Sequence, residues 1–392
     1  MSSPRMSFRL VALMLCGLAY AMPAKCGQRV VDLTASDGTK LKATYFDAGK
    51  PGPGVLLLHQ CNRERKVWNG LATQLSGAGI NVLTLDNRGF GESGGEPHDK
   101  LSPQEEGKVE TEKWPGDFDV AIAYLESQPG VTRNMIGVGG ASCGVNNSVQ
   151  AARRHPEVRS LVLLSGPTDL NGRNYLRNSA KTPVFLAVAD DDEFGATPEI
   201  EWLYTLTSNP GKKLVHYAKG GHGADMFPVH PELPGLITDW YVTTLIKTPG
   251  RAPVAKVAPV ILPEARNLDL IDQPGGAAKV AARLAEARKG DPKATLFPEA
   301  MVNIMGYDHL QAGDTKTAIE IFKLNVAGYP TSPNTYDSLS DGYIAAGQKD
   351  LARENVKKAL ELLPGDTKDP KAFREGLKET DEQKLKDWGE GK

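Results

Sequence analysis

Short, continuously apolar runs recur between residues 28 and 247, separated by stretches in which apolar residues follow helical spacing. The clearest runs lie at 54–59, 80–85, 135–139, 160–164, 183–188 and 213–217. Strands that are apolar on both sides belong to a sheet whose two faces are covered. The alternation with helical stretches predicts an α/β domain over 28–247 with a doubly wound, mostly parallel sheet. A hairpin of 30–33 and 41–45, turning at Asp37-Gly38, is predicted at its start.

Two changes of pattern divide the rest of the chain. Residues 248–276 are rich in proline, alanine and valine without a clear period, and we predict a linker there. Residues 277–392 have a helical pattern throughout, which predicts an all-α domain. Three pairs of identical residues recur there at a spacing of 34: Gly313 and Gly347, Ala318 and Ala352, and Pro330 and Pro364. This spacing is the tetratricopeptide period, and it predicts two repeats, 299–332 and 333–366. A helical bundle without repeats is the alternative.

The first residues have the three-part layout of a secretory signal. Arg5 and Arg9 precede an apolar run at 10–18, and residues 19–21 (Ala-Tyr-Ala) offer a small-x-small cleavage pattern. We therefore predict a signal peptide over 1–21 and a periplasmic or secreted protein. An uncleaved anchor or a buried helix are the alternatives. No later stretch is apolar enough to predict a membrane span in the mature chain.

Composition excludes several classes of function. The formal net charge is −2, and no basic face is evident, so nucleic acid is not an expected partner. There are four cysteines, of which Cys16 falls in the predicted signal. The other three are too few and too scattered for a disulfide framework or a zinc site. No cofactor and no metal are expected.

A G-x-S-x-G pentapeptide occupies residues 140–144, directly after a predicted strand and directly before a predicted helix. The motif requires that context, because its turn leaves no room for side chains two residues before and after the serine. Ser142 is therefore the candidate nucleophile, at a helix N-terminus whose dipole favours a developing oxyanion. Centring the motif on Cys143 would place Val145 where glycine is needed. Cys143 is instead predicted to supply a backbone N–H to the oxyanion hole.

The base is selected by its place along the chain. His222 lies in a Gly-Gly-His-Gly loop just after the last predicted strand, from which it can reach a nucleophile. His230, further along the chain, is a weaker candidate, and His216 lies inside the strand, where a packed core residue is expected. Three other histidines are predicted to lie on the surface: His98, His155 and His309. Three adjacent carboxylates follow the strand at 183–188: Asp190, Asp191 and Asp192. Like charges this close cannot all be buried, so one is expected to face the histidine and the others solvent.

Together these motifs resemble the α/β-hydrolase superfamily over residues 28–247, and most closely its dienelactone-hydrolase-type members. The pentapeptide, the run 85–93 (Leu-Asp-Asn-Arg-Gly-Phe-Gly-Glu-Ser) and the Gly-His-Gly loop carry the resemblance. Dienelactone hydrolases place a cysteine where this chain has Ser142. That difference favours a general ester over a dienelactone as substrate.

The resemblance also implies an acid and a second oxyanion donor. The family acid stands three residues past the small residue that closes its strand, which is Asp192 when counted from Ala189; Asp190 and Asp191 remain alternatives. In the family's His-Gly-x position this chain has His-Gln-Cys, so the backbone N–H of Cys61 is the implied donor. Glutamine in place of the usual glycine departs from the pattern.

The two expected oxyanion donors are both cysteines, Cys61 and Cys143. Two N–H groups that point at one oxygen must have neighbouring Cα atoms, and disulfides join Cα atoms about 4.4–6.8 Å apart. We therefore state the hypothesis that an oxidising periplasm closes a disulfide between them. Diverging Cβ directions would prevent it.

These assignments predict an exported serine hydrolase that cleaves a small-molecule carboxylic ester through an acyl-enzyme on Ser142, with Asp192 and His222 completing the triad. A peptidase or amidase of the same fold is one alternative. The other is a binding protein in which the repeats recruit a protein or peptide partner and the hydrolase domain is inactive. The ester itself is not identifiable from the sequence.

Overall fold

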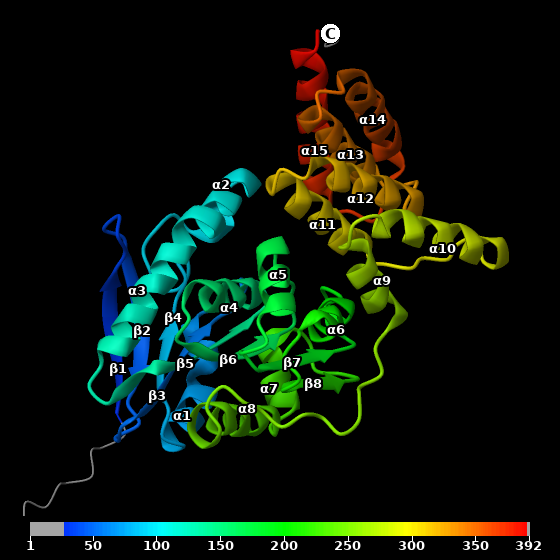
Figure 1. Ribbon diagram of the computed structural model, residues 1–392. Coiled ribbons are helices and arrows are strands. Elements are labelled where there is room, and N and C mark those ends of the chain that lie inside the picture. The colour runs from blue at the N-terminus through cyan, green and yellow to red at the C-terminus, as the bar shows by residue number, and fades with distance from the viewer. Residues whose placement is uncertain (1–26, 390–392) are drawn as a thin grey trace, which may run out of the picture.

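An eight-stranded sheet forms the centre of the computed structural model, which describes residues 27–389. The predicted signal peptide at 1–21 lies outside the described residues. The strand order is β1-β2-β4-β3-β5-β6-β7-β8 (Figure 1). The strands are β1 (Gln28–Thr34), β2 (Lys40–Phe46), β3 (Gly52–Leu58), β4 (Asn81–Leu85), β5 (Val131–Ala141), β6 (Val158–Leu164), β7 (Val184–Ala189) and β8 (Lys212–Tyr217). The expected hairpin β1–β2 and the pair β2–β4 are antiparallel, and the other neighbours are parallel. The predicted doubly wound, mostly parallel sheet is confirmed.

Helices cover both faces of the sheet (Figure 1). One layer contains α3 (Trp114–Ser127), α4 (Cys143–Arg154), α5 (Leu170–Asn178) and α6 (Thr197–Leu206), and the other contains α1 (Asn69–Gly77) and α8 (Leu233–Tyr241). On the central strand β3, Leu56 and Leu58 pack under the first layer, whereas Val55 and Leu57 pack under the second. Successive side chains of a strand point to opposite faces. A strand buried on both faces must therefore be apolar at every position, as the sequence pattern indicated.

The C-terminal part of the described chain is helical. It contains α9 (Pro263–Ile271), α10 (Gly276–Gly290), α11 (Glu299–Gln311), α12 (Thr315–Gly328), α13 (Pro333–Ala345), α14 (Lys349–Leu362) and α15 (Lys371–Asp387). Each predicted repeat holds one helix pair, α11–α12 or α13–α14. Gly313 and Gly347 lie between the helices of each pair with φ of 80° and 72°, a conformation that glycine adopts most readily. The assignment of these pairs as tetratricopeptide repeats stays a prediction. Within residues 27–389 no helix has the length and apolar character needed to cross a membrane.

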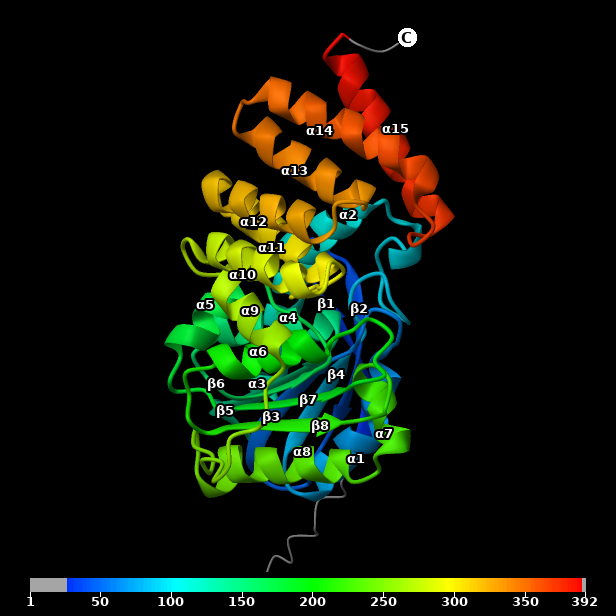
Figure 2. The same ribbon diagram turned by 90° about the vertical axis from the view of Figure 1, so that its right-hand side faces the viewer.

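Helix α9 lies inside the segment predicted as a linker. Pro263 occupies its first turn, where proline is well tolerated. Ala265, Leu268 and Ile271 are buried at a spacing of three and pack in the same core as α6. A helix of nine residues has too few turns for its period to stand out, so the sequence pattern did not reveal it. The helical region is therefore packed onto the α/β domain (Figure 2).

A buried arginine links the two regions. The Arg173 side chain on α5 is fully buried, and it donates to Asp272 after α9 at 2.9 Å and to Asp308 on α11 at 2.6 Å. Arg177, one turn further along α5, also pairs with Asp272. A buried guanidinium is tolerated only where carboxylates compensate its charge. The position of α11 over α5 is therefore specified by charge as well as by apolar packing.

Candidate functional site

The predicted nucleophile lies in a sharp turn between β5 and α4. Ser142 has φ of 54° and ψ of −122°, a backbone conformation that residues other than glycine rarely adopt. A Cβ atom at Gly140 would lie 2.0 Å from the Gly144 carbonyl oxygen, and one at Gly144 would lie 2.4 Å from that of Leu58. These contacts explain both glycines of the pentapeptide. The half-buried Ser142 is thus at the C-terminal edge of the sheet and the N-terminus of α4.

The predicted base and acid are hydrogen-bonded to each other. The distance from His222 Nδ1 to Asp192 Oδ2 is 2.8 Å, and both side chains are almost completely buried. The second Asp192 oxygen accepts the backbone N–H of Phe194 at 2.9 Å, which fixes the carboxylate in place. Asp190 is bound to His216 instead, at 2.6 Å, and Asp191 accepts backbone N–H groups of the glycines before His222. Of the three adjacent carboxylates, Asp192 is the one that contacts His222.

The loops that carry Ser142 and His222 are packed on each other. Gly223 follows the histidine with φ of 61°, and a Cβ atom there would lie 3.0 Å from the Ala141 Cβ. The residue after His222 therefore contacts the residue before Ser142. Positions 142 and 222, which are 80 residues apart in the sequence, lie at the same edge of the sheet.

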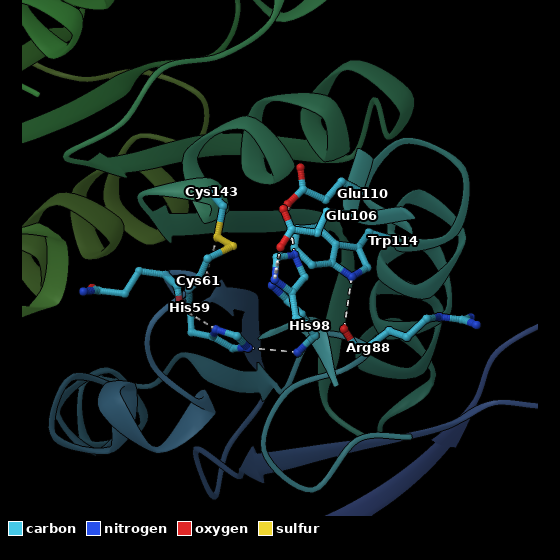
Figure 3. The surroundings of a disulfide bond; sticks show 10 residues. His59, Cys61, Arg88, His98, Glu106, Glu110, Trp114 and Cys143 are labelled. Carbon is cyan, nitrogen blue, oxygen red and sulfur yellow. Dashed lines mark hydrogen bonds and ion pairs between the residues drawn. A yellow bond between two sulfur atoms is a disulfide. The ribbon is translucent and has the colours of Figure 1, made fainter. Parts of the chain in front are cut away.

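The two predicted oxyanion donors are joined by a disulfide (Figure 3). The Cα atoms of Cys61 and Cys143 are 5.9 Å apart, so the hypothesis drawn from the sequence is confirmed. Cys61 follows the end of β3, and Cys143 is the first residue of α4. Within residues 27–389 neither backbone N–H has a hydrogen-bond partner. Both groups are thus free to bind an oxygen, and their oxyanion role stays a prediction.

A cavity of about 430 Å³ lies over α4, the helix that begins directly after Ser142. Asn146 and Asn147 of α4 line one side, and Asp308 and Gln311 of α11 line another. Cavities of about 300–1,000 Å³ are typical of small-molecule sites. The C-terminal helices therefore form part of the wall of this cavity, whose lining includes none of Ser142, Asp192 and His222.

Comparison with known proteins supports this description. Residues 49–177 match the family model described as "Serine aminopeptidase, S33". The N-terminal part of the chain has the α/β-hydrolase fold. The thiohydrolase aneE of Aspergillus aculeatus is 29% identical over 135 residues, which are 34% of this chain and 39% of that protein. The chain spans only 39–47% of the length of the curated relatives it matches.

Two solved structures are similar to the α/β-hydrolase part of the chain, both at TM-scores below 0.5. The Pyrococcus furiosus esterase Pf2001 has a TM-score of 0.47 and 22% identity, covering 56% of this chain and 93% of its own. A dienelactone hydrolase from Anabaena variabilis has a TM-score of 0.44 and 21% identity, covering 56% of this chain and 98% of its own. The finer resemblance to dienelactone hydrolases, and the repeats, stay predictions.

Within this α/β-hydrolase fold, Gln60 has a role that sequence reasoning missed; it is the residue that departs from the family pattern. The Gln60 side chain is buried, and its Oε1 accepts the Ala224 N–H at 2.9 Å. Its Nε2 lies 3.4 Å from both the His222 carbonyl oxygen and the Asp225 carboxylate. Gln60 therefore attaches the end of β3 to the loop that carries the predicted base. Only contacts across more than 160 residues reveal this role.

Two of the histidines predicted to lie on the surface do not. The His309 side chain is buried beside Asp272. The His98 side chain is 13% exposed, because it packs against the rings of Phe90 and Trp114. Aromatic packing of this kind depends on tertiary structure, so the prediction for these two residues was wrong.

Proposed function

We propose that this chain is a serine hydrolase that cleaves carboxylic esters through an acyl-enzyme on Ser142, with His222 as base and Asp192 as acid. The observation that carries the proposal is the buried Asp192–His222 pair, with its 2.8 Å hydrogen bond, beside the loop of Ser142. The match to a hydrolase family model over 49–177 supports it.

The contact with Asp192 supports one tautomer of His222. When His222 Nδ1–H donates to Asp192, Nε2 keeps its lone pair and can accept the Ser142 proton. The serine oxygen then attacks the ester carbonyl, and the imidazolium returns the proton to the leaving alcohol. Water cleaves the acyl-enzyme with the same base. The N–H groups of Cys61 and Cys143 stabilise the oxyanion, and loss of one such donor costs about 100-fold or more in rate.

Labelling by a fluorophosphonate and turnover of short p-nitrophenyl esters test the proposal together. We expect wild type to be labelled, and both signals to fall by about 10⁴-fold or more in Ser142→Ala and His222→Ala. Ser127→Ala is the control, because that serine is exposed at the end of α3. Unchanged labelling in Ser142→Ala would contradict the assignment. Absence of labelling in folded wild type would favour the binding-protein alternative.

Amide hydrolysis is a second candidate, because the matching family model is described as a serine aminopeptidase. A thioester is a further acyl substrate of the same mechanism, and one relative is named a thiohydrolase. An ester, a thioester and an aminoacyl anilide with one common acyl group separate these cases. We expect the ester to have the highest kcat/KM, and a higher value for the anilide would replace the proposal by a peptidase.

We further propose that the protein is exported. The Cys61–Cys143 disulfide supports this, since disulfides persist in oxidising compartments and are rare in the cytosol. The sequence layout over 1–21 adds to it. Cell fractionation, with N-terminal sequencing of the recovered protein, is the test. Recovery in the cytosol with Met1 retained would contradict export.

A further inference from the structure

A histidine and two carboxylates lie beside the disulfide and have no part in the proposed catalytic set (Figure 3). His98 Nε2 is 3.2 Å from Glu110 Oε1, and His98 Nδ1 is 3.7 Å from Glu106 Oε1. The two glutamates are four residues apart on the continuous helical segment formed by α2 (Pro103–Lys108) and η3 (Val109–Lys113), so they share one face. Phe90 and Trp114 both pack against the imidazole ring, at centroid distances of 4.8 and 5.7 Å. The cluster is thus ordered by packing as well as by charge.

Cys61 completes a set of three metal-ligand atoms. The Cys61 Sγ, a ring nitrogen of His98 and a carboxylate oxygen of Glu110 all lie within 4.8 Å of one another. Bonds of about 2.0–2.3 Å to a tetrahedral Zn²⁺ place ligand atoms roughly 3.3–3.7 Å apart. The His98–Glu110 distance of 3.2 Å is within about 0.1 Å of that range. Cys61 is only half-buried, so its side chain has room to approach once it is released from Cys143.

We propose that Cys61, His98 and Glu110 form a Zn²⁺ site that becomes available when the Cys61–Cys143 disulfide is opened. A metal ligand must be a thiolate, and a disulfide sulfur is not one. A dithiol reductant passes two electrons and two protons to the disulfide and becomes a disulfide itself. The Cys61 thiol then loses its proton as it binds Zn²⁺. Imidazole, thiolate and carboxylate are all ligands that zinc accepts, and three of them leave one position open.

In this site Glu106 would orient the imidazole ring of His98. With His98 Nε2 on the metal, Nδ1–H points toward Glu106 Oε1 at 3.7 Å. Carboxylates that accept the second N–H of a ligating histidine fix its tautomer and orientation, and their loss lowers metal affinity by about 10–100-fold. The arrangement depends on no catalytic role for Ser142, so it stands or fails separately from the proposed hydrolase activity.

Two single variants distinguish the site from a simple effect of opening the disulfide. Cys143→Ser and Cys61→Ser both remove the bond, but only the first keeps the ligand. With Co²⁺ in place of Zn²⁺, we expect a thiolate-to-cobalt charge-transfer band in Cys143→Ser without reductant, and none in Cys61→Ser. Both variants retain Cys26, which therefore cannot explain a difference. Absence of the band in Cys143→Ser, or equal bands in both, would overturn the proposal.

The wild-type chain gives a second test that does not depend on a cysteine variant. After a phosphine reductant opens the disulfide, Zn²⁺ affinity is measured by competition with a chromophoric chelator. We expect His98→Gln and Glu110→Gln to lower that affinity by about tenfold or more. His155→Gln is the matched control, because His155 also lies between two carboxylates, Asp119 and Glu157. An equal loss in the control, or no loss in His98→Gln, would exclude the site.

Discussion

Loss of the Cys61–Cys143 disulfide is predicted to destabilise the α/β domain by about 2–5 kcal/mol. The two cysteines are separated by 82 residues. For a loop of that length, the entropy removed from the unfolded chain is about 15 cal mol⁻¹ K⁻¹, or about 4.5 kcal/mol at about 25 °C. Cys61 and Cys143 follow neighbouring strands, β3 and β5, whose pairing keeps them close without the bond. Most of the change therefore falls on the unfolded chain.

Urea unfolding followed by tryptophan fluorescence measures this loss. The samples are oxidised wild type, wild type with a phosphine reductant, and the double variant Cys61→Ser/Cys143→Ser. With an m-value of about 2–3 kcal/mol per M, we expect the midpoint to fall by about 1–2 M. Each single variant opens the same bond, so its midpoint is expected to match that of the double variant. A shift below about 0.3 M in the reduced wild type would refute the loop-entropy reasoning.

Three further predictions address other parts of the molecule. Gln60→Leu releases the loop of the predicted base, so kcat for an ester is expected to fall by about 10–100-fold while KM stays unchanged; a change in KM alone would contradict this. Asp272→Asn leaves the buried Arg173 without its main partner, so we expect the free energy of unfolding, measured by thermal unfolding, to fall by about 3–5 kcal/mol. The control is Asp350→Asn, which breaks an exposed ion pair and is expected to cost less than about 0.5 kcal/mol. Burial and a nearby carboxylate raise the pKa of Glu199 from 4.5 to about 8. The folded chain therefore keeps a proton that the unfolded chain releases above about pH 4.5, so stability falls as pH rises toward 8 and Glu199→Gln removes that fall. A wild-type-to-variant difference in Tm that is the same at pH 4 and pH 9 would contradict the shift.

Local sequence patterns were sufficient to predict the sheet and the turn that carries Ser142. The parallel strands β3 and β7 are buried on both faces, so their sequences are almost continuously apolar and are recognisable without knowledge of their neighbours. The glycines at 140 and 144 are required by contacts with backbone atoms, which exist for any sequence in such a turn. The choice of Asp192 among three carboxylates followed from a family position, and the 2.8 Å contact with His222 agrees with it.

Contacts between segments far apart in the sequence could not be predicted from the pattern of apolar and polar residues. His98 looked like a surface histidine because its neighbours in sequence are polar, yet its ring packs on Phe90 and Trp114. Helix α9 is amphipathic over only nine residues, and its apolar side became recognisable only against α6. The charge network around Arg173 joins positions 99 and 135 residues apart. No spacing rule connects residues at such separations.

The dipeptide Gln60-Cys61 shows how a departure from a family pattern can have a structural reason. A glycine at position 60 has no side chain and could make no side-chain contact. The glutamine side chain instead holds the loop of His222, because its Oε1 accepts the Ala224 N–H. Its neighbour Cys61 is bonded to the first residue of the helix that follows Ser142. Two successive residues at the end of β3 thus fix both the loop of the predicted base and the turn of the predicted nucleophile. Opening the disulfide frees the nucleophile side and leaves the Gln60 contacts intact, whereas Gln60→Leu does the reverse. If the Gln60 hydrogen bonds and the disulfide act separately, the rate losses caused by Gln60→Leu and by Cys61→Ser should multiply in the double variant. A double variant no slower than either single variant would show that the two interactions act as a unit.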